Sequence, residues 1–172
     1  MQSLNRIAYI SIFTAGAISL FVVESLIPQP IPGIRLGLAN IFILLVLLTF
    51  GFREALLVGI LKSVVGSLII ARLLTPSFLF SISGTIMSII VMALAVKYLK
   101  SVSLVGISIL GAETHTFTQI LIATFLFFGK ASFVYLLVPF VLLSLITGSI
   151  TGMCTYWLYE RTEGKIEFAK AP

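Results

Sequence analysis

Long apolar runs, separated by short polar or proline-rich connectors, make up almost the whole chain. A helix needs about 20 predominantly apolar residues to cross a bilayer, and most of these runs approach that length. The runs are continuous, without the apolar–polar alternation that is typical of membrane β-barrels. The pattern therefore predicts an all-α integral membrane bundle. We expect six transmembrane helices, over residues 7–27, 38–50, 54–74, 78–97, 104–128 and 133–159.

The composition supports a membrane protein with a single domain. Of the 172 residues, 59% are hydrophobic and 10% are charged, whereas a soluble domain carries about 25% charged residues. So few charged side chains cannot cover the surface of a water-soluble fold. We expect one six-helix domain over residues 1–160 and a short polar cytoplasmic tail over residues 161–172.

The basic residues predict the orientation of the bundle. Lys and Arg collect on the cytoplasmic side of membrane proteins. With the N-terminus inside, the cytoplasmic side holds Arg6, Arg53, Lys97, Lys100, Arg161, Lys165 and Lys170, and the outer side holds Arg35, Arg72 and Lys130. We therefore expect an N-in, C-in, multi-pass protein of the cell membrane, with Tyr156, Trp157 and Tyr159 as an aromatic anchor inside. The net charge of +5 reflects this orientation and does not indicate nucleic-acid binding.

A few ionisable side chains lie in the middle of apolar runs and are the candidates for function. A charge at the centre of a bilayer costs roughly 2.5–3.5 kcal/mol, so its retention indicates a role. Lys62 lies near the middle of its predicted helix, and Glu113 and His115 lie at a similar depth in another. Lys62 is either the counter-ion of a ligand or the structural partner of Glu113, since an unpaired buried charge is costly.

The predicted helix over residues 104–128 carries a polar face. Its members recur at helical spacing: Ser108, Ala112, His115 and Gln119. They form either the wall of a binding site or polar contacts between helices. Glu113 points elsewhere unless Gly111 breaks the helix.

Further polar residues gather in the outer half of the predicted bundle. Glu24, Arg35 and Asn40 lie near the outer ends of the first two helices, which suggests a pocket that opens outward. Glu24 is alternatively solvated at the interface, and Arg35 and Arg72 alternatively anchor the protein there. The proline-rich segment 28–32 is either a lid over the pocket or a stiff connector.

Two patterns of small residues indicate close helix packing. Ser11, Ala15 and Ser19 recur at intervals of four, which lets another helix approach, from this chain or from a partner. Gly148 and Gly152 form a similar pair that we interpret as a packing feature.

Several absences argue against catalysis. The chain has no Asp, and isoprenoid synthases of the usual kind use Asp-rich motifs to hold magnesium against diphosphate. It has no phosphate-binding loop for ATP and no Ser/His/Asp arrangement. One Cys and one His are too few for a Cys/His metal site. We expect no enzymatic activity, no cofactor and no metal.

Three blocks of sequence carry a resemblance to a known family. They are Glu24 with Pro28-Gln-Pro-Ile-Pro-Gly-Ile-Arg-Leu-Gly-Leu-Ala-Asn40, Ser81-Ile-Ser-Gly84 with Met87 and Ser88, and Ser108-Ile-Leu-Gly-Ala-Glu-Thr-His115 with Gln119. Together they resemble the Gx transporter family, which is often labelled heptaprenyl diphosphate synthase component I. One departure is Thr116, where the family has Asn after its His.

The resemblance implies a fold and a function similar to those of the S components of energy-coupling-factor (ECF) transporters. Such a subunit has six helices, binds a vitamin-like molecule near the outer face, and joins a transmembrane coupling subunit and two ATPases. The implied substrate here is a vitamin, quinone or isoprenoid precursor bound by Glu24, Arg35, Asn40, Lys62, Glu113, His115 and Gln119, and the implied docking surface is Ser11, Ala15 and Ser19. The alternative is a non-catalytic accessory subunit of a prenyl-chain synthase or redox complex.

Overall fold

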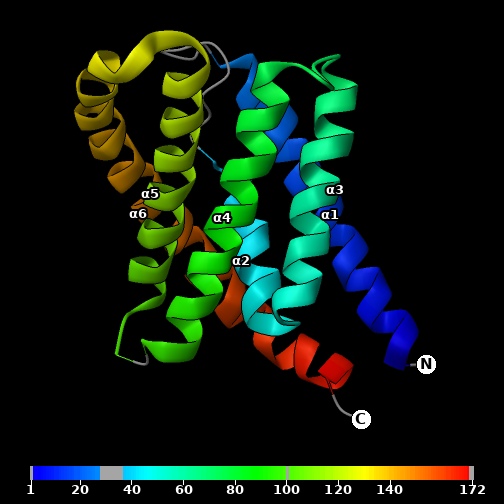
Figure 1. The fold of residues 1–172 in the computed structure, drawn as a ribbon. Helices are drawn as coiled ribbons and strands as arrows, with labels where there is room; N and C mark the ends of the chain where they lie inside the picture. Colours follow the sequence, from blue (N-terminus) through cyan, green and yellow to red (C-terminus); the bar gives the residue numbers. More distant parts are fainter. Residues whose placement is uncertain (1, 28–36, 100, 171–172) are drawn as a thin grey trace.

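The computed structural model describes the backbone of residues 2–27, 37–99 and 101–170, and it describes their side chains except at residues 2–3, 127–137 and 163–170. This part of the chain folds into six α-helices and one π-helical turn (Figure 1). The elements are α1 (Gln2–Leu26), α2 (Asn40–Thr49), α3 (Phe52–Ile69), α4 (Pro76–Tyr98), α5 (Leu104–Ala123), η1 (Thr124–Phe128) and α6 (Gly129–Lys170). The predicted all-α class is thereby confirmed.

The connection between α3 and α4 begins earlier than the apolar pattern predicts. The pattern extended the third helix to residue 74, whereas α3 ends at Ile69. Ala71 and Leu74 both have a positive φ, of 53° and 64°, which a right-handed helix excludes. Pro76 then starts α4, where its missing N–H needs no partner.

The connection between α5 and α6 is helical, whereas the sequence predicted a break at residues 129–131. The π-helical turn Thr124–Phe128 leads directly into α6, and α6 continues to Lys170 through most of the predicted polar tail. The polar composition of the tail therefore did not end the helix.

Three helices are long and apolar enough to cross a membrane within the described ranges: Leu4–Leu26, Pro76–Tyr98 and Val138–Thr162. The six crossings that the sequence predicted are thus supported for three helices only. α2 has 10 residues, which at 1.5 Å per residue span about 15 Å, half of a hydrocarbon core of about 30 Å. α3 carries three charged residues, Arg53, Glu54 and Lys62, and α5 carries Glu113, His115 and Gln119 among its apolar residues.

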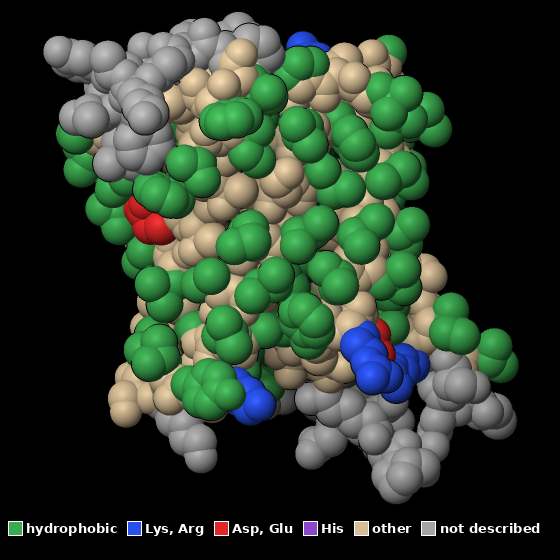
Figure 2. All heavy atoms as spheres, in the orientation of Figure 1, with side chains coloured by type: hydrophobic (Ala, Val, Ile, Leu, Met, Phe, Trp, Pro, Cys, Tyr) green, Lys and Arg blue, Asp and Glu red, His purple; other side chains and the backbone are tan. Residues whose placement is uncertain are grey.

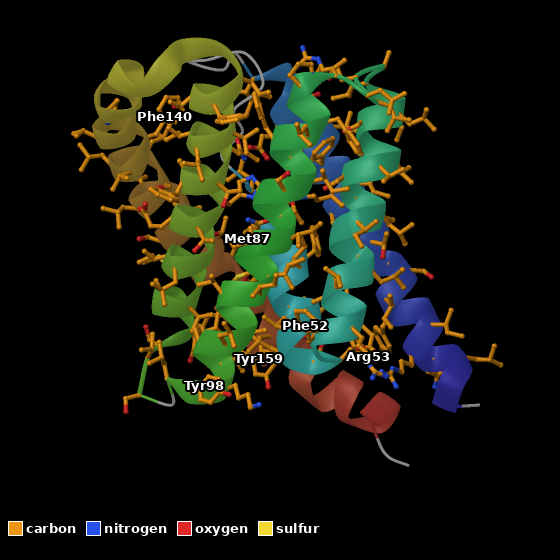
Figure 3. The ribbon with its side chains drawn as sticks, viewed as in Figure 1. Phe52, Arg53, Met87, Tyr98, Phe140 and Tyr159 are labelled. Atoms are coloured by element: carbon orange, nitrogen blue, oxygen red, sulfur yellow. The ribbon has the colours of Figure 1, made fainter. Side chains whose placement is uncertain are left out.

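The two ends of the described chain lie at the same end of the bundle, which we call the terminal end (Figure 1). The opposite end is called the distal end. Apolar side chains cover the middle of the visible surface, and Lys and Arg side chains lie toward its ends (Figure 2). Tyr98 and Tyr159 lie near the terminal end, and Phe140 lies near the distal end (Figure 3). This distribution fits a bundle embedded in a bilayer.

Part of the apolar core surrounds α2 in the half of the bundle near the terminal end. Ile43, Leu44, Leu45 and Val46 are fully buried there. Because α2 is short and runs toward the terminal end, its first residue lies at mid-height in the bundle (Figure 1). Residues 37–39, just before α2, lie beside α5, since a Cβ atom added at Gly37 would lie 3.5 Å from Cδ2 of His115.

α5 and α6 pack with almost no space between their backbones. A Cβ atom added at Gly148 would lie 2.8 Å from the Cα of Ile109, and one added at Gly152 would lie 2.8 Å from the Cα of Val105. Ser108 and Thr151 share a hydrogen bond of 2.8 Å across the same contact. These glycines are packing residues, as their spacing indicated.

Candidate functional site

Glu24 joins the end of α1 to the segment before α2. Its side chain is buried, and its Oε1 accepts a 2.7 Å hydrogen bond from the backbone N–H of Gly37. Its Oε2 accepts a 3.2 Å hydrogen bond from the N–H of Leu38. A carboxylate that accepts from backbone donors is well suited to hold a turn in place. Glu24 is therefore not a solvated interfacial residue.

Gly37 brings this turn against α5. Its φ of +80° is a left-handed conformation that favours glycine. A Cβ atom added there would lie 3.0 Å from Nδ2 of Asn40 and 3.5 Å from Cδ2 of His115. Glu24, Asn40 and His115 come from three elements and meet around this one glycine.

His115 packs against α4 on its other side. It is 1% exposed. A Cβ atom added at Gly84 would lie 2.9 Å from its Nδ1 and 3.0 Å from its backbone oxygen. Only glycine lets α4 and the imidazole come this close. Gln119, one turn further toward the distal end on the same face of α5, is also fully buried.

Lys62 reaches the same region from α3. It is 2% exposed, and its Nζ donates a 2.8 Å hydrogen bond to Oγ1 of Thr85, the residue after Gly84. The ammonium also lies 5.7 Å from the centre of the Phe21 ring on α1, a cation–π contact. Lys62 and His115 thus point inward, and Gly84 and Thr85 connect them.

We call the following group the polar assembly: Glu24, Asn40, Lys62, Thr85 and His115, which the contacts above connect through Gly37 and Gly84, and Gln119, one turn from His115 on the same face of α5. Its members come from α1, α2, α3, α4 and α5 and are all buried. It combines a carboxylate, an ammonium, an imidazole and two amides, which suits binding of a polar molecule. Among the described residues, no group of three His, Cys or acidic side chains is placed to hold a metal ion.

Other predicted site residues lie apart from this assembly. Glu113 is only partly buried and its Oε1 has no hydrogen-bond partner within the described part of the chain, so the structure does not pair it with Lys62. α5 is continuous through Gly111, which leaves Glu113 on a different side from His115. Ser108 and Ala112 are buried toward α6. Arg35 and the predicted lid over residues 28–32 lie outside the described residues.

The small residues of α1 face outward. Ser11, Ala15 and Ser19 are all exposed, whereas Gly16 beside them packs against the ring of Phe42. The stripe is therefore accessible to a partner. Arg72 is exposed in the turn after α3, in keeping with an anchoring role.

Sequence reasoning missed three contributions to the assembly. Thr85 and the N–H groups of Gly37 and Leu38 are uncharged, so they did not stand out as candidate site groups. Phe21 could not be distinguished from the other apolar residues of its helix. Two blocks of the resemblance were available as signals: Pro28 to Asn40 contains Gly37 and Leu38, and Ser81 to Gly84 ends beside Thr85, but these residues were given no role.

We expect Glu24→Gln to loosen the turn before α2. The amide keeps one acceptor but places an NH2 group against a second backbone N–H, and an unsatisfied buried donor costs about 1–3 kcal/mol. Amide hydrogen exchange at Gly37 and Leu38 should accelerate and thermal stability should fall. The matched control is Glu54→Gln, which removes an exposed ion pair with Arg6 worth about 1 kcal/mol or less. Equal effects in the two variants would contradict this role for Glu24.

A family model described as heptaprenyl diphosphate synthase component I matches residues 13–158 of the chain. This range covers most of the protein and all described members of the polar assembly. Comparison with curated proteins and with solved structures gives no match. The chain therefore belongs to the heptaprenyl diphosphate synthase component I family, as its motifs predicted.

Proposed function

We propose that this protein is the substrate-binding membrane subunit of an ECF-type transporter and captures a small molecule from outside the cell. The observation that carries the proposal is the polar assembly, in which a buried lysine and a buried histidine meet side chains from three further helices. Keeping ionisable groups inside an apolar bundle is costly. Binding of a polar substrate explains why the sequence retains them.

The chemistry of the chain supports a binding role rather than catalysis. The whole sequence lacks Asp, and a diphosphate-transferring enzyme needs carboxylates that hold magnesium. The polar assembly itself contains one carboxylate, Glu24, and both of its oxygens accept from backbone N–H groups. We therefore propose that the family description refers to an association and that this chain does not carry the synthase reaction.

Energy for uptake comes, in this proposal, from partner subunits. A transmembrane coupling subunit docks on the exposed stripe of Ser11, Ala15 and Ser19 on α1, and ATPases attached to it drive release into the cell. Small side chains allow a partner helix to approach closely within the membrane. Because α1 carries both this stripe and Glu24, docking at one side of the helix is coupled to the turn at the other.

We expect Ala15→Trp to separate transport from binding. The indole blocks the approach of a partner helix but lies on the lipid-facing side of α1, away from the polar assembly. ATP-dependent accumulation of substrate by cells should fall to background, while the small molecules that co-purify with the variant stay unchanged. Leu142→Trp is the control, since Leu142 is exposed on α6 outside the stripe.

The partners that co-purify decide between the two candidate functions. Wild-type protein should bring down a coupling subunit with two ATPases, and Ala15→Trp should not. Recovery of a soluble prenyl-chain synthase without any ATPase, unaffected by Ala15→Trp, would instead establish the accessory role.

A further inference from the structure

Seven Ser and Thr hydroxyls in the described helices bond to the backbone of their own helix, one turn earlier. Each donates to the carbonyl four residues earlier, at 2.7–2.8 Å, as is usual where water is scarce. This group comprises Thr14, Thr49, Thr114, Thr118, Ser149, Thr155 and Thr162. Their hydroxyls are satisfied inside the helix and need no other partner.

A set of serines on α3 and α4 departs from this rule. Their buried Oγ atoms have no hydrogen-bond partner among the residues that the structure describes. We call them the unpartnered serines: Ser63, Ser67, Ser77, Ser81 and Ser88. A buried hydroxyl without a partner destabilises a fold. Several in one region indicate that something outside the described chain satisfies them.

The unpartnered serines of α4 form a stripe along one helix face. Ser77, Ser81 and Ser88 are separated by four and seven residues, with Gly84 between the last two. Gly84 packs on His115, and a Cβ atom added at Gly111 of α5 would lie 3.1 Å from Ser88 Oγ. The stripe therefore lies along the contact between α4 and α5, at the level of Gly111 and His115. At 1.5 Å per residue it extends about 16 Å, from the distal end past the level of His115.

Asn40 requires a hydrogen-bond donor from its partner, whereas the serine hydroxyls can donate to an acceptor. Its Oδ1 is buried and has no hydrogen-bond partner within the described ranges. An amide oxygen only accepts, so it needs an N–H or O–H group from its partner. Hydroxyls that donate and an oxygen that accepts thus lie in the same region as the ammonium of Lys62.

From these donors and acceptors we infer the chemical class of the bound molecule. This inference rests on the proposed function. It is a small hydrophilic compound that carries both hydrogen-bond donors and acceptors, with an acceptor or anionic group at Lys62. A prenyl chain has no hydrogen-bonding groups and would leave the serines unsatisfied. A quinone ring offers only acceptors and would leave Asn40 Oδ1 without a donor. The substrate is therefore neither a bare prenyl chain nor a quinone, although the family description points to prenyl chemistry.

The test compares what co-purifies with three proteins expressed in the same cells. They are the wild type, the double variant Ser81→Ala/Ser88→Ala, and a control, Thr114→Val/Ser149→Ala, which removes two backbone-bonded hydroxyls. Each purified protein is partitioned between chloroform and aqueous methanol, and both phases are quantified by mass spectrometry per mole of protein. We expect a compound in the aqueous phase that the wild type and control retain equally. The double variant should retain roughly tenfold less of it, having lost two hydrogen bonds.

The remaining outcomes contradict the inference in distinguishable ways. A compound found only in the chloroform phase overturns the hydrophilic class and leaves the binding function standing. Equal retention by all three proteins excludes the serines as binding groups.

If neither phase of the wild-type preparation holds a bound compound, the inference and the proposed function both fail. Removing unpartnered hydroxyls should not lower the melting temperature; a lower value in the double variant, with the control unchanged, would show that the serines are structural instead. Single Ser81→Ala replaces the double variant should the latter not fold.

Discussion

Lys62→Met should abolish substrate binding while leaving the protein folded. Methionine has nearly the length and volume of lysine but no charge, so the packing against Phe21 is kept. Loss of a buried charged contact costs about 2–5 kcal/mol of binding free energy, or a roughly 30-fold to several-thousand-fold weaker affinity. Removing the ammonium leaves the buried Thr85 hydroxyl without its donor but also removes the cost of burying a charge, so the two effects on stability partly offset each other.

A binding lysine predicts loss of the bound molecule with only a small change in stability, whereas loss of a structural lysine would lower the stability strongly. The measurements are the amount of co-purified small molecule per mole of protein and the melting temperature in detergent. Lys97→Met is the matched control because Lys97 is exposed in the last turn of α4. A Lys62→Met protein that keeps its bound molecule, or that melts far below the control, would exclude Lys62 as a binding residue.

The cost of burying charge made part of the site predictable. Lys62 and His115 stood out because few side chains are ionisable inside otherwise apolar runs, and the structure buries both. Helical spacing also placed Gln119 beside His115. Periodicity showed that Glu113 lies on another side of the helix, and the unbroken α5 agrees. Charge and period together therefore identified the centre of the polar assembly.

The sequence could not show which polar groups, far apart along the chain, contact one another in the fold. The contact of Glu24 with Gly37 depends on a turn that enters the bundle, and no local pattern encodes that path. The bond from Lys62 to Thr85 depends on the packing of α3 on α4. The unpartnered serines look like any other serines until their lack of backbone bonding is seen. Such features follow from tertiary packing alone.

The sequence also predicted the helices better than it predicted where they begin and end. Apolar runs located all six helices, because each run must bury its surface. They failed at Ala71 and Leu74, where an apolar segment leaves the helix with positive φ. They failed again at residues 129–131, where a short polar stretch stays helical. Hydropathy predicts which segments are buried. It does not predict where a helix ends, because the backbone conformation at each end depends on the residues that the end contacts.

Leucine at Gly148 or Gly152 should disrupt the contact between α5 and α6. Even a Cβ atom at either position would lie 2.8 Å from the backbone of α5, closer than atoms can approach. A backbone cannot move aside as a flexible side chain can, so the two helices must separate. Separation would also break the hydrogen bond between Ser108 and Thr151. Overpacking of this kind costs about 1–3 kcal/mol and occasionally more.

A graded series at the two glycines tests this explanation. Alanine gains about 1 kcal/mol of helix propensity over glycine, but its Cβ would already lie 2.8 Å from the Cα of Val105, so Gly152→Ala should itself lower the free energy of unfolding, by less than leucine does. Gly152→Leu adds bulk without further propensity and should lower the free energy of unfolding by about 2 kcal/mol or more. Ser149→Leu adds similar bulk on the outward side of the same turns and should change stability little. Thermal unfolding in detergent measures all three variants. Because the polar face of α5 is held by this contact, Gly152→Leu should also reduce the retained small molecule, whereas a leucine tolerated at both glycines would mean that α6 does not position α5.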